Sequence, residues 1–370
     1  MTEDQDQYYM RLALKEARKG MGKTSPNPCV GAVIVKDDRV IAKGYHKRAG
    51  GPHAEINALR KAGTQARGAT VYVTLEPCNH TGRTPPCTRA LLAAGVKRVV
   101  VGMEDPNPLV HGSGLAFLAD HKIQVSSGVL AADCRRINSP FIKHITTSLP
   151  WVVMKAGLSL DGRITYKKGC PGGITGPRSL QRVHQLRNIA DAIMVGIGTV
   201  VIDDPALTTR LLRRQGKDPI RVVVDSRLRI PLAARLLHVH SNAPTWIFCG
   251  PEADPEKKEQ LIALGALVRT VERDTEGGLD LMQILSILGS HGVTSLLVEG
   301  GAAIHGAMLR NRLVDHVHLF YAPIFAGDDG ISVVRGLSCA AKEDAIYLEK
   351  IRYERLCDDL MVEGDVAYHS

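Results

Sequence analysis

HAEINALRKAGTQARGATVYVTLEPCNHTGRTPPC, residues 53–87, contains one imidazole and two thiols at positions that suit a single zinc ion. The segment after His53 is typical of a helix, and Thr70–Leu75 alternates as a strand before Cys78. Cys87 opens the next helix, where backbone N–H groups and the helix dipole favour a thiolate. We therefore expect His53, Cys78 and Cys87 to meet at one edge of a sheet and to hold zinc with a fourth position open to water.

Glu55 lies only two residues after His53, so it cannot easily share the same metal ion. The pattern H-x-E followed by P-C…C is the signature of zinc deaminases that act on nucleobases. In that chemistry Glu55 takes a proton from water and passes it to a ring nitrogen and then to the departing ammonia. The alternative is a closed structural zinc site with a fourth ligand, for which the candidates are His80, His46 and Cys29.

The rest of the first half alternates helices and strands, which favours an α/β domain with a parallel-type sheet covered on both faces. The helices are expected at Tyr8–Lys19, Ala54–Lys61 and Cys87–Ala94, and the strands at Cys29–Val35, Val40–Tyr45, Thr70–Leu75 and Val96–Val101. The regular pattern ends around residues 135–149, so we place a domain boundary there. The first domain is expected to span residues 1–147 and the second residues 148–370.

A second α/β pattern follows this boundary. Its strands are expected at Trp151–Lys155, Ala192–Val195, Arg221–Val224, Thr245–Cys249, Ser295–Val298 and His316–Tyr321. Its helices are expected at Ser179–Arg187, Pro255–Leu264, Leu279–Leu288 and Ala303–Asn311. Glycine-rich turns follow two strands, at Gly196–Thr199 and at Glu299–Gly301. Such a turn before a helix can admit a phosphate, although it is more often a plain turn, and neither segment is a G-x-G-x-x-G motif.

The composition is that of a globular protein, because 44% of the 370 residues are apolar and 23% are charged. No apolar run approaches the roughly 18 residues that span a bilayer, and the acidic start does not resemble a secretory signal, so we expect a soluble cytoplasmic protein. The net charge of +9 favours anionic ligands, either phosphorylated metabolites or nucleic acid. The small number of aromatic residues, 2 Trp, 9 Tyr and 5 Phe, argues against a stacking platform for single strands.

Several motifs in the first half resemble one known family. Glu76–Cys87, with eight residues between its cysteines, resembles the deaminase half of the bifunctional riboflavin-biosynthesis deaminase/reductases, as do Ser25–Gly31, Gly44–His46, Gly51–Glu55 and, nearly, Glu104–Pro108. The resemblance implies a cytidine-deaminase-like three-layer α/β/α domain and a 2,5-diamino-6-ribosylamino-4(3H)-pyrimidinone 5′-phosphate substrate. It further implies that Asn27 helps to hold the base and that Arg83 or Lys47 meets the phosphate.

Motifs in the second half resemble the reductase of the same family, and they are Lys155–Arg163, Gly198–Val200, Asp203–Thr208, Val224–Ser226 and Glu299–Gly301. The resemblance implies a dihydrofolate-reductase-like α/β domain. With NADPH this domain reduces the ribosyl group of 5-amino-6-(5-phosphoribosylamino)uracil to the ribityl form.

The same resemblance implies the contacts of this second site. The NADP contacts are Gly157, Gly173, Thr199, Asp203, Ser226, Gly301, Ala302, Ala303, Ile304, His305, Gly306 and Ala307. The substrate contacts are Pro171, Arg187, Leu207, Arg210 and Glu299. Lys155 and Asp203 are candidates for proton handling as the ribose ring opens. Family members often carry Trp-Ile-Thr near residues 171–175, where this chain has Gly173-Ile174-Thr175, so one cofactor contact is lost or made by the backbone of Gly173.

Two other functions stay open at this point. A tRNA or other nucleic-acid base deaminase with a non-catalytic, nucleotide-binding C-terminal domain fits the positive charge, but the long cysteine spacing argues against it. A structural zinc protein is the other. The favoured function needs Zn²⁺ and NADPH, small phosphorylated pyrimidines as partners, and neither nucleic acid nor membrane. We expect the chains to form a homo-oligomer through the C-terminal domain.

Overall fold

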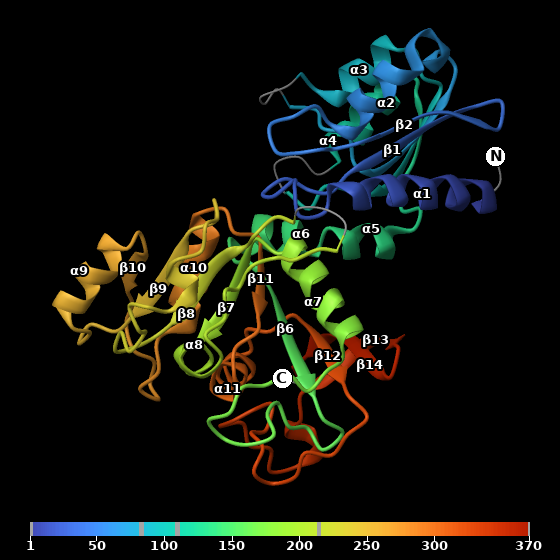
Figure 1. The fold of residues 1–370 in the computed structure, drawn as a ribbon. Helices are drawn as coiled ribbons and strands as arrows, with labels where there is room; N and C mark the ends of the chain where they lie inside the picture. The colour runs from blue at the N-terminus through green and yellow to red at the C-terminus, as the bar shows by residue number, and fades with distance from the viewer. Residues whose placement is uncertain (1–2, 81–84, 108–111, 213–215, 369–370) are drawn as a thin grey trace. The chain divides into compact units, whose positions relative to one another are not determined.

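The computed structural model describes residues 3–80, 85–107, 112–212 and 216–368, and the chain divides into two compact units, Met1–Ser148 and Leu149–Ser370 (Figure 1). Each unit has its own sheet and its own buried core. In the described part of the chain, no helix combines the length and the apolar character that crossing a membrane requires. The expected fold of two α/β domains is confirmed.

The first unit contains a five-stranded sheet in the order β2-β1-β3-β4-β5. Its strands are β1 Gly31–Lys36, β2 Arg39–Tyr45, β3 Thr70–Leu75, β4 Arg98–Met103 and β5 Gln124–Ser126. Strands β3, β4 and β5 are parallel, but β1 is antiparallel to both β2 and β3. The residues Lys36-Asp37-Asp38-Arg39 predict a hairpin turn, which is confirmed: Asp37 and Asp38 both have positive φ, and the turn joins two antiparallel strands. The expected parallel-type sheet is confirmed for β3, β4 and β5 and is wrong for the pairing of β1 with β3.

Helices cover both faces of this sheet, which gives the expected three layers. They are α1 Glu3–Ala17, α2 Ala54–Ala62, α3 Cys87–Ala93, α4 Ser113–Asp120, α5 Ala131–Ile137 and α6 Ser139–Thr147, with short 3₁₀ turns at Arg18–Gly20 and Gly63–Ala66. Gly31 lets the backbone of α1 approach one face, and Gly44 lets the backbone of α2 approach the other. A Cβ atom at either glycine would clash with helix backbone, so both positions need glycine.

Two features of these helices differ from the expectation. Helix α1 begins at Glu3 rather than Tyr8, because Glu3, Asp4 and Asp6 in its first turn stabilise the helix N-terminus. Helices α5 and α6 occupy the region where no regular pattern was found. Helix α5 buries Cys134 against β4, whereas none of the side chains of α6 is fully buried.

The second unit contains a nine-stranded sheet in the order β10-β9-β8-β7-β11-β6-β12-β14-β13. The strands are β6 Trp151–Leu158, β7 Ala192–Gly196, β8 Ile220–Val224, β9 Thr245–Cys249, β10 Leu267–Thr270, β11 Ser295–Val298, β12 His316–Tyr321, β13 Tyr347–Leu356 and β14 Asp359–Ala367. All neighbouring pairs from β10 to β12 are parallel, and β14 is antiparallel to β12 and β13. Strands β10, β13 and β14 were not expected from the sequence.

Helices flank both faces of this sheet as well. They are α7 Pro177–Ile189, α8 Ile197–Asp203, α9 Pro255–Ala263, α10 Leu281–Ser290 and α11 Ala302–Arg310, with 3₁₀ turns at Arg235–Leu237 and Lys342–Asp344. Neighbouring strand residues point to opposite cores: Met194 packs with α10 and α11, and Ile193 packs with α8 and α9. The expected turn at Gly196–Thr199 is wrong, since β7 ends at Gly196 and α8 begins at the next residue.

Candidate functional site

Three segments of the first unit bring the expected zinc ligands together. His53 is the N-cap residue of α2, Cys78 follows β3, and Cys87 is the first residue of α3. His53 Nδ1 lies 3.5 Å from Cys78 Sγ and 3.3 Å from Cys87 Sγ. Two ligands of a tetrahedral zinc ion stand about 3.6 Å apart when one is nitrogen and the other sulfur, so the spacing fits zinc. Among the residues that the structure describes, no further histidine, cysteine or carboxylate joins this cluster.

The two thiols differ in acidity. Hydrogen bonds from Cys87, followed by one from His53, lower the pKa of Cys78, and the backbone N–H of Cys87 also donates to Cys78 Sγ over 3.4 Å. A thiolate at Cys78 is the form that binds a metal ion. The hydrogen bond with Cys78 raises the pKa of His53. The segment is therefore arranged to present negative charge to a cation.

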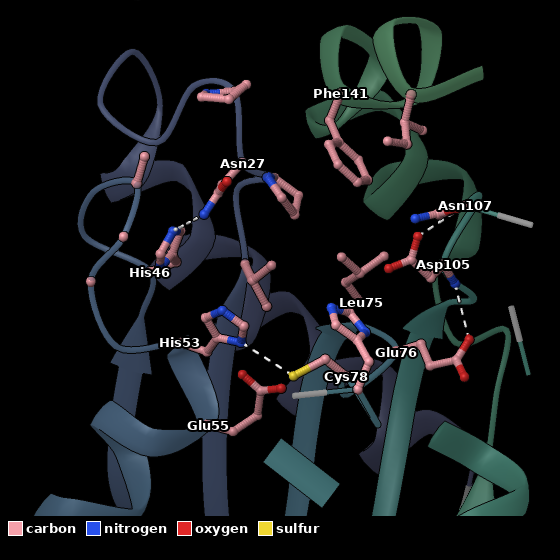
Figure 2. A pocket seen from close by; sticks show the side chains of 18 residues that line it. Asn27, His46, His53, Glu55, Leu75, Glu76, Cys78, Asp105, Asn107 and Phe141 are labelled. Atoms are coloured by element: carbon pink, nitrogen blue, oxygen red, sulfur yellow. Dashed lines mark hydrogen bonds between the residues drawn. The ribbon is translucent and has the colours of Figure 1, made fainter. Parts of the chain in front are cut away.

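Glu55 is buried beside this cluster, with only 3% of its surface exposed. Burial raises the pKa of its carboxyl group, and Oε2 has no hydrogen-bond partner within the protein. Figure 2 shows Glu55, His53 and Cys78 together at the base of a pocket. A buried carboxyl group with one unused oxygen is suited to accept and release a proton at this position.

The pocket above the cluster has a volume of about 460 Å³, which is in the range of small-molecule sites. Asn27, a predicted substrate contact, lines it and donates from Nδ2 to His46 Nε2 over 3.2 Å. The opposite ring nitrogen, His46 Nδ1, donates to the carbonyl of Pro52, so Nε2 must accept. Burial lowers the pKa of His46, which agrees with this neutral ring. The amide of Asn27 is thereby oriented with Oδ1 left for a ligand.

Sequence reasoning missed several residues of the pocket. Asp105 and Asn107 line it from a loop that was noticed only as a near match to the family, and Phe141 lines it from α6 (Figure 2). His46 was considered as a fourth metal ligand and as part of a family motif, and its contact with Asn27 was not predicted. Lys47 is exposed and is not among the lining residues. Arg83 lies outside the described residues.

A buried ion cluster marks the second unit. The guanidinium of Arg187, on α7, donates to both oxygens of Glu299, from Nε over 2.7 Å and from Nη2 over 2.8 Å. Lys155 Nζ, on β6, lies 3.1 Å from Glu299 Oε2. Burial alone would raise the pKa of Glu299, but Lys155 and Arg187 hold it at about 2. Three of the predicted reductase residues therefore form one rigid charged group.

The other predicted substrate and proton-handling residues lie at the end of α8 and in loops of the second unit. Asp203, at the end of α8, accepts from the N–H of Gly172 over 3.3 Å, and burial raises its pKa. Arg210 donates from its backbone to His184 Nδ1 over 3.2 Å and exposes its side chain. Leu207 is buried, whereas Pro171 is exposed.

The predicted cofactor residues gather at the carboxyl ends of neighbouring strands. Strand β11 leads through Glu299 and Gly300 to Gly301, the N-cap residue of α11. Because glycine has no side chain, nothing at this position caps the helix. Thr199 lies within van der Waals distance of a Cβ placed at Gly301. The uncapped helix start and the glycine pair form a place where a phosphate can approach the backbone, so the residues present fit a dinucleotide.

The remaining cofactor residues are placed as follows. Gly157 packs against Thr175, Gly173 is exposed with φ +114°, and Ser226 follows β8. Ala302, Ala303 and Ile304 form the first turn of α11, and Ala307 lies further along it. His305 and Gly306 are both buried. His305 Nδ1 contacts the carbonyl of Val333, and Gly306 packs against Arg335.

Two family models match the chain. One, described as the cytidine and deoxycytidylate deaminase zinc-binding region, matches residues 3–103, and the other, described as the RibD C-terminal domain, matches residues 150–362. The riboflavin biosynthesis protein RibD of Bacillus amyloliquefaciens is 39% identical, over 99% of this chain and 100% of its own length. The protein of the same name from Escherichia coli strain K12 is 41% identical, over 94% of this chain and 96% of its own.

Two solved structures are similar to this chain over nearly its whole length. Form 1 of Acinetobacter baumannii RibD superposes with a TM-score of 0.88 at 36% identity and covers 99% of this chain and 100% of its own. A diaminohydroxyphosphoribosylaminopyrimidine deaminase/5-amino-6-(5-phosphoribosylamino)uracil reductase from Thermotoga maritima gives a TM-score of 0.85 at 34% identity, with 99% of each chain covered. These similarities extend over both units of the chain.

Proposed function

The chain belongs to the RibD family and is a bifunctional deaminase and reductase of riboflavin biosynthesis, and on that premise we propose how its residues divide the two reactions. Residues 1–147 deaminate 2,5-diamino-6-ribosylamino-4(3H)-pyrimidinone 5′-phosphate by hydrolysis. Residues 148–370 reduce the ribosyl group of 5-amino-6-(5-phosphoribosylamino)uracil to the ribityl form with NADPH. The two activities in the name of the Thermotoga maritima relative support this division.

The observation that carries the deaminase assignment is the triangle of His53 Nδ1 and the sulfurs of Cys78 and Cys87 beside the buried Glu55. We propose that the three side chains hold Zn²⁺. When bound, zinc supplies a Lewis acid that lowers the pKa of a water molecule in the site.

Glu55 moves the protons of the hydrolysis. Its raised pKa and its unused Oε2 suit it to take a proton from the attacking water. It gives this proton to the ring nitrogen, then takes a second proton from the added hydroxyl group and gives it to the leaving amino group, so that a carbon–oxygen double bond replaces the bond to the amino nitrogen and ammonia departs. Asn27, oriented by His46, presents Oδ1 to a donor on the base.

The reductase assignment rests on the cluster of Lys155, Arg187 and Glu299. NADPH, when bound, would supply a hydride to the sugar carbon C1′, which stays attached to the exocyclic amino nitrogen while its bond to the ring oxygen breaks. The ring oxygen that is released needs a proton, and Lys155 keeps donors beyond the one directed at Glu299. Asp203, whose pKa burial raises, is the second candidate for this proton.

The further contacts of this site are part of the same proposal. Arg187, Leu207, Arg210, Glu299 and Pro171 hold the substrate. The cofactor lies along Gly157, Gly173, Thr199, Asp203, Ser226 and Gly301–Ala307. We further propose a cytoplasmic enzyme that forms a homo-oligomer through its C-terminal domain and binds no nucleic acid.

Glu55→Gln tests the deaminase proposal with paired assays. Ammonia release should fall by about 10²–10⁴-fold, because the amide cannot carry the proton. Zinc content should equal that of the unsubstituted chain, and NADPH consumption with the deaminated substrate should persist. Glu3→Gln, at the exposed start of α1, is the matched control. Undiminished ammonia release would remove Glu55 from the reaction, and loss of zinc would mean that it supports the metal instead.

A further inference from the structure

A second group of metal-binding side chains lies outside both sites, on the paired strands β12 and β14. His316 and His318 alternate on β12 and therefore point to the same face of the sheet. In the antiparallel register, Asp365 stands directly opposite the first histidine and Glu363 directly opposite the second. Two imidazoles and two carboxylates thus meet on one face of a strand pair.

The first histidine is oriented as a metal ligand usually is. His316 Nδ1 donates to Asp365 Oδ1 over 2.9 Å, which leaves the lone pair on Nε2. Histidines that bind metals commonly donate their other ring N–H to a carboxylate in this way. Lys350 Nζ holds the other oxygen of Asp365 at 2.9 Å, so this carboxylate positions the histidine rather than binding a cation itself.

The second histidine is buried without a hydrogen bond. His318 is 8% exposed, and its Nδ1 has no hydrogen-bond partner although Glu363 Oε2 lies 3.3 Å away. Burial, with His316 and Arg182, lowers the pKa of His318 to about 3, so its ring is neutral and able to bind a metal ion. A carboxylate oxygen facing an unpaired ring nitrogen is an arrangement that a cation between them would satisfy.

We propose that His316, His318 and Glu363 form a second metal site, which takes a divalent transition cation of the Zn²⁺ class. One candidate ligand atom from each residue lies within 4.8 Å of the others. Two nitrogens and one carboxylate oxygen suit zinc or cobalt better than magnesium or calcium, which prefer ligand sets of oxygen alone. The proposal does not depend on the thiolate cluster, which lies in the other unit.

The neighbouring positive charges set the limits of this site. Arg182 approaches from α7, where it also pairs with Glu354 over 3.6 Å, and Lys350 approaches from β13. Both positive charges repel a cation bound nearby and so weaken its binding. The site should consequently be weaker than the thiolate cluster and should lose its metal first to a chelator.

Cobalt(II) distinguishes the two sites, because only a thiolate ligand gives intense sulfur-to-metal charge-transfer absorption. Equilibrium dialysis of the full chain against Co²⁺ should show two ions per chain. The full-length double variant Cys78→Ser, Cys87→Ser should keep one ion and lose the charge-transfer band. Adding Glu363→Gln to it should remove the remaining ion or weaken its binding at least tenfold.

Glu349→Gln is the matched control, because Glu349 pairs with Asp365 on the neighbouring strand but is exposed and is not a proposed ligand. The Glu349→Gln variant should bind the same number of cobalt ions per chain as the protein without this substitution. A folded double-cysteine variant without any bound cobalt would overturn the proposal, as would an equal loss in the Glu349→Gln control. If the double variant does not fold, the test is made in the unsubstituted chain, where Glu363→Gln should lower two ions to one; no change there would also overturn it.

Discussion

Glu299 shows how one residue can organise a site. Its carboxylate receives both Arg187 and Lys155, from a helix and from a strand, and its side chain is only 5% exposed. The three charges do not cancel, since two cations surround one anion. The surplus positive charge suits a phosphorylated substrate, and the bidentate contact fixes the guanidinium in one orientation.

Glu299→Gln should destabilise the second unit by about 3–5 kcal/mol, because it leaves two buried cations without their counter-charge. Urea unfolding followed by tryptophan fluorescence measures this, since Trp151 and Trp246 both lie in that unit. NADPH consumption should fall as well. Glu259→Gln, on an exposed position of α9, should change neither value. An unchanged unfolding midpoint in Glu299→Gln would show that the cluster does not stabilise the fold.

At this scale the sequence predicted which three side chains of the first unit come together. His53, Cys78 and Cys87 meet as expected because each borders a strongly patterned helix or strand. It did not predict the contact of His46 with Asn27, because both residues lie outside regular elements, and spacing along a loop does not determine where its side chains point.

The residues around Asp105 and the start of α4 both depend on one carboxylate, that of Glu76. Glu76, next to the metal-binding segment, accepts from the N–H groups of Asp105 and Gly112 with Oε2 and of Gly114 and Leu115 with Oε1. It therefore joins the segment that carries Cys78 to the start of α4 and to the loop that brings Asp105 into the pocket.

Glu76→Gln should loosen this loop, because an amide offers one acceptor oxygen where the carboxylate offers two. The KM of deamination should rise several-fold, with a smaller change in kcat, and stability should fall by about 1–3 kcal/mol. Steady-state ammonia release and urea unfolding test both effects. Glu104→Gln, the next half-buried carboxylate, is the control. A fall in kcat alone would mean that Glu76 acts on the metal ligands instead.

Elements with a clear pattern were found from the sequence, and the others were not. Strand β3 matches its expected range because all six of its residues are buried β formers. Strand β13 was missed because its residues are mostly exposed and charged, so no apolar face distinguishes it. Helix α8 was missed because Gly198, together with Gly196 just before the helix, is typical of a turn.

The folding stability of the second unit should depend on pH, because this unit contains buried histidines. Burial lowers the pKa of His305 to about 4, and burial together with Arg187 and Arg210 lowers that of His184 to about 4. An unfolded histidine titrates near 6.5, so between about pH 4 and 6.5 the unfolded chain binds more protons. Stability of this unit therefore rises with pH across that window and is lost as the pH falls through it.

His305→Asn should reduce the loss of unfolding free energy between pH 7 and pH 5 by about 1–2 kcal/mol. The measurement is urea unfolding by tryptophan fluorescence at both pH values, without cofactor. The exposed His240→Asn serves as the control and should leave the difference between the two pH values as it was. An equal response in both variants would assign the pH dependence to groups other than the buried ring.

Gly31 and Gly44 leave no room for even one methyl group between the sheet and helices α1 and α2. Directed evolution of this deaminase toward other bases should therefore find almost no accepted changes at these two positions. The adaptable positions are those of the pocket rim, such as residues 26–28 and 49–51, which line the pocket from outside the helices and strands. The closeness of the layers thus separates the part of the enzyme that can acquire a new specificity from the part that cannot change.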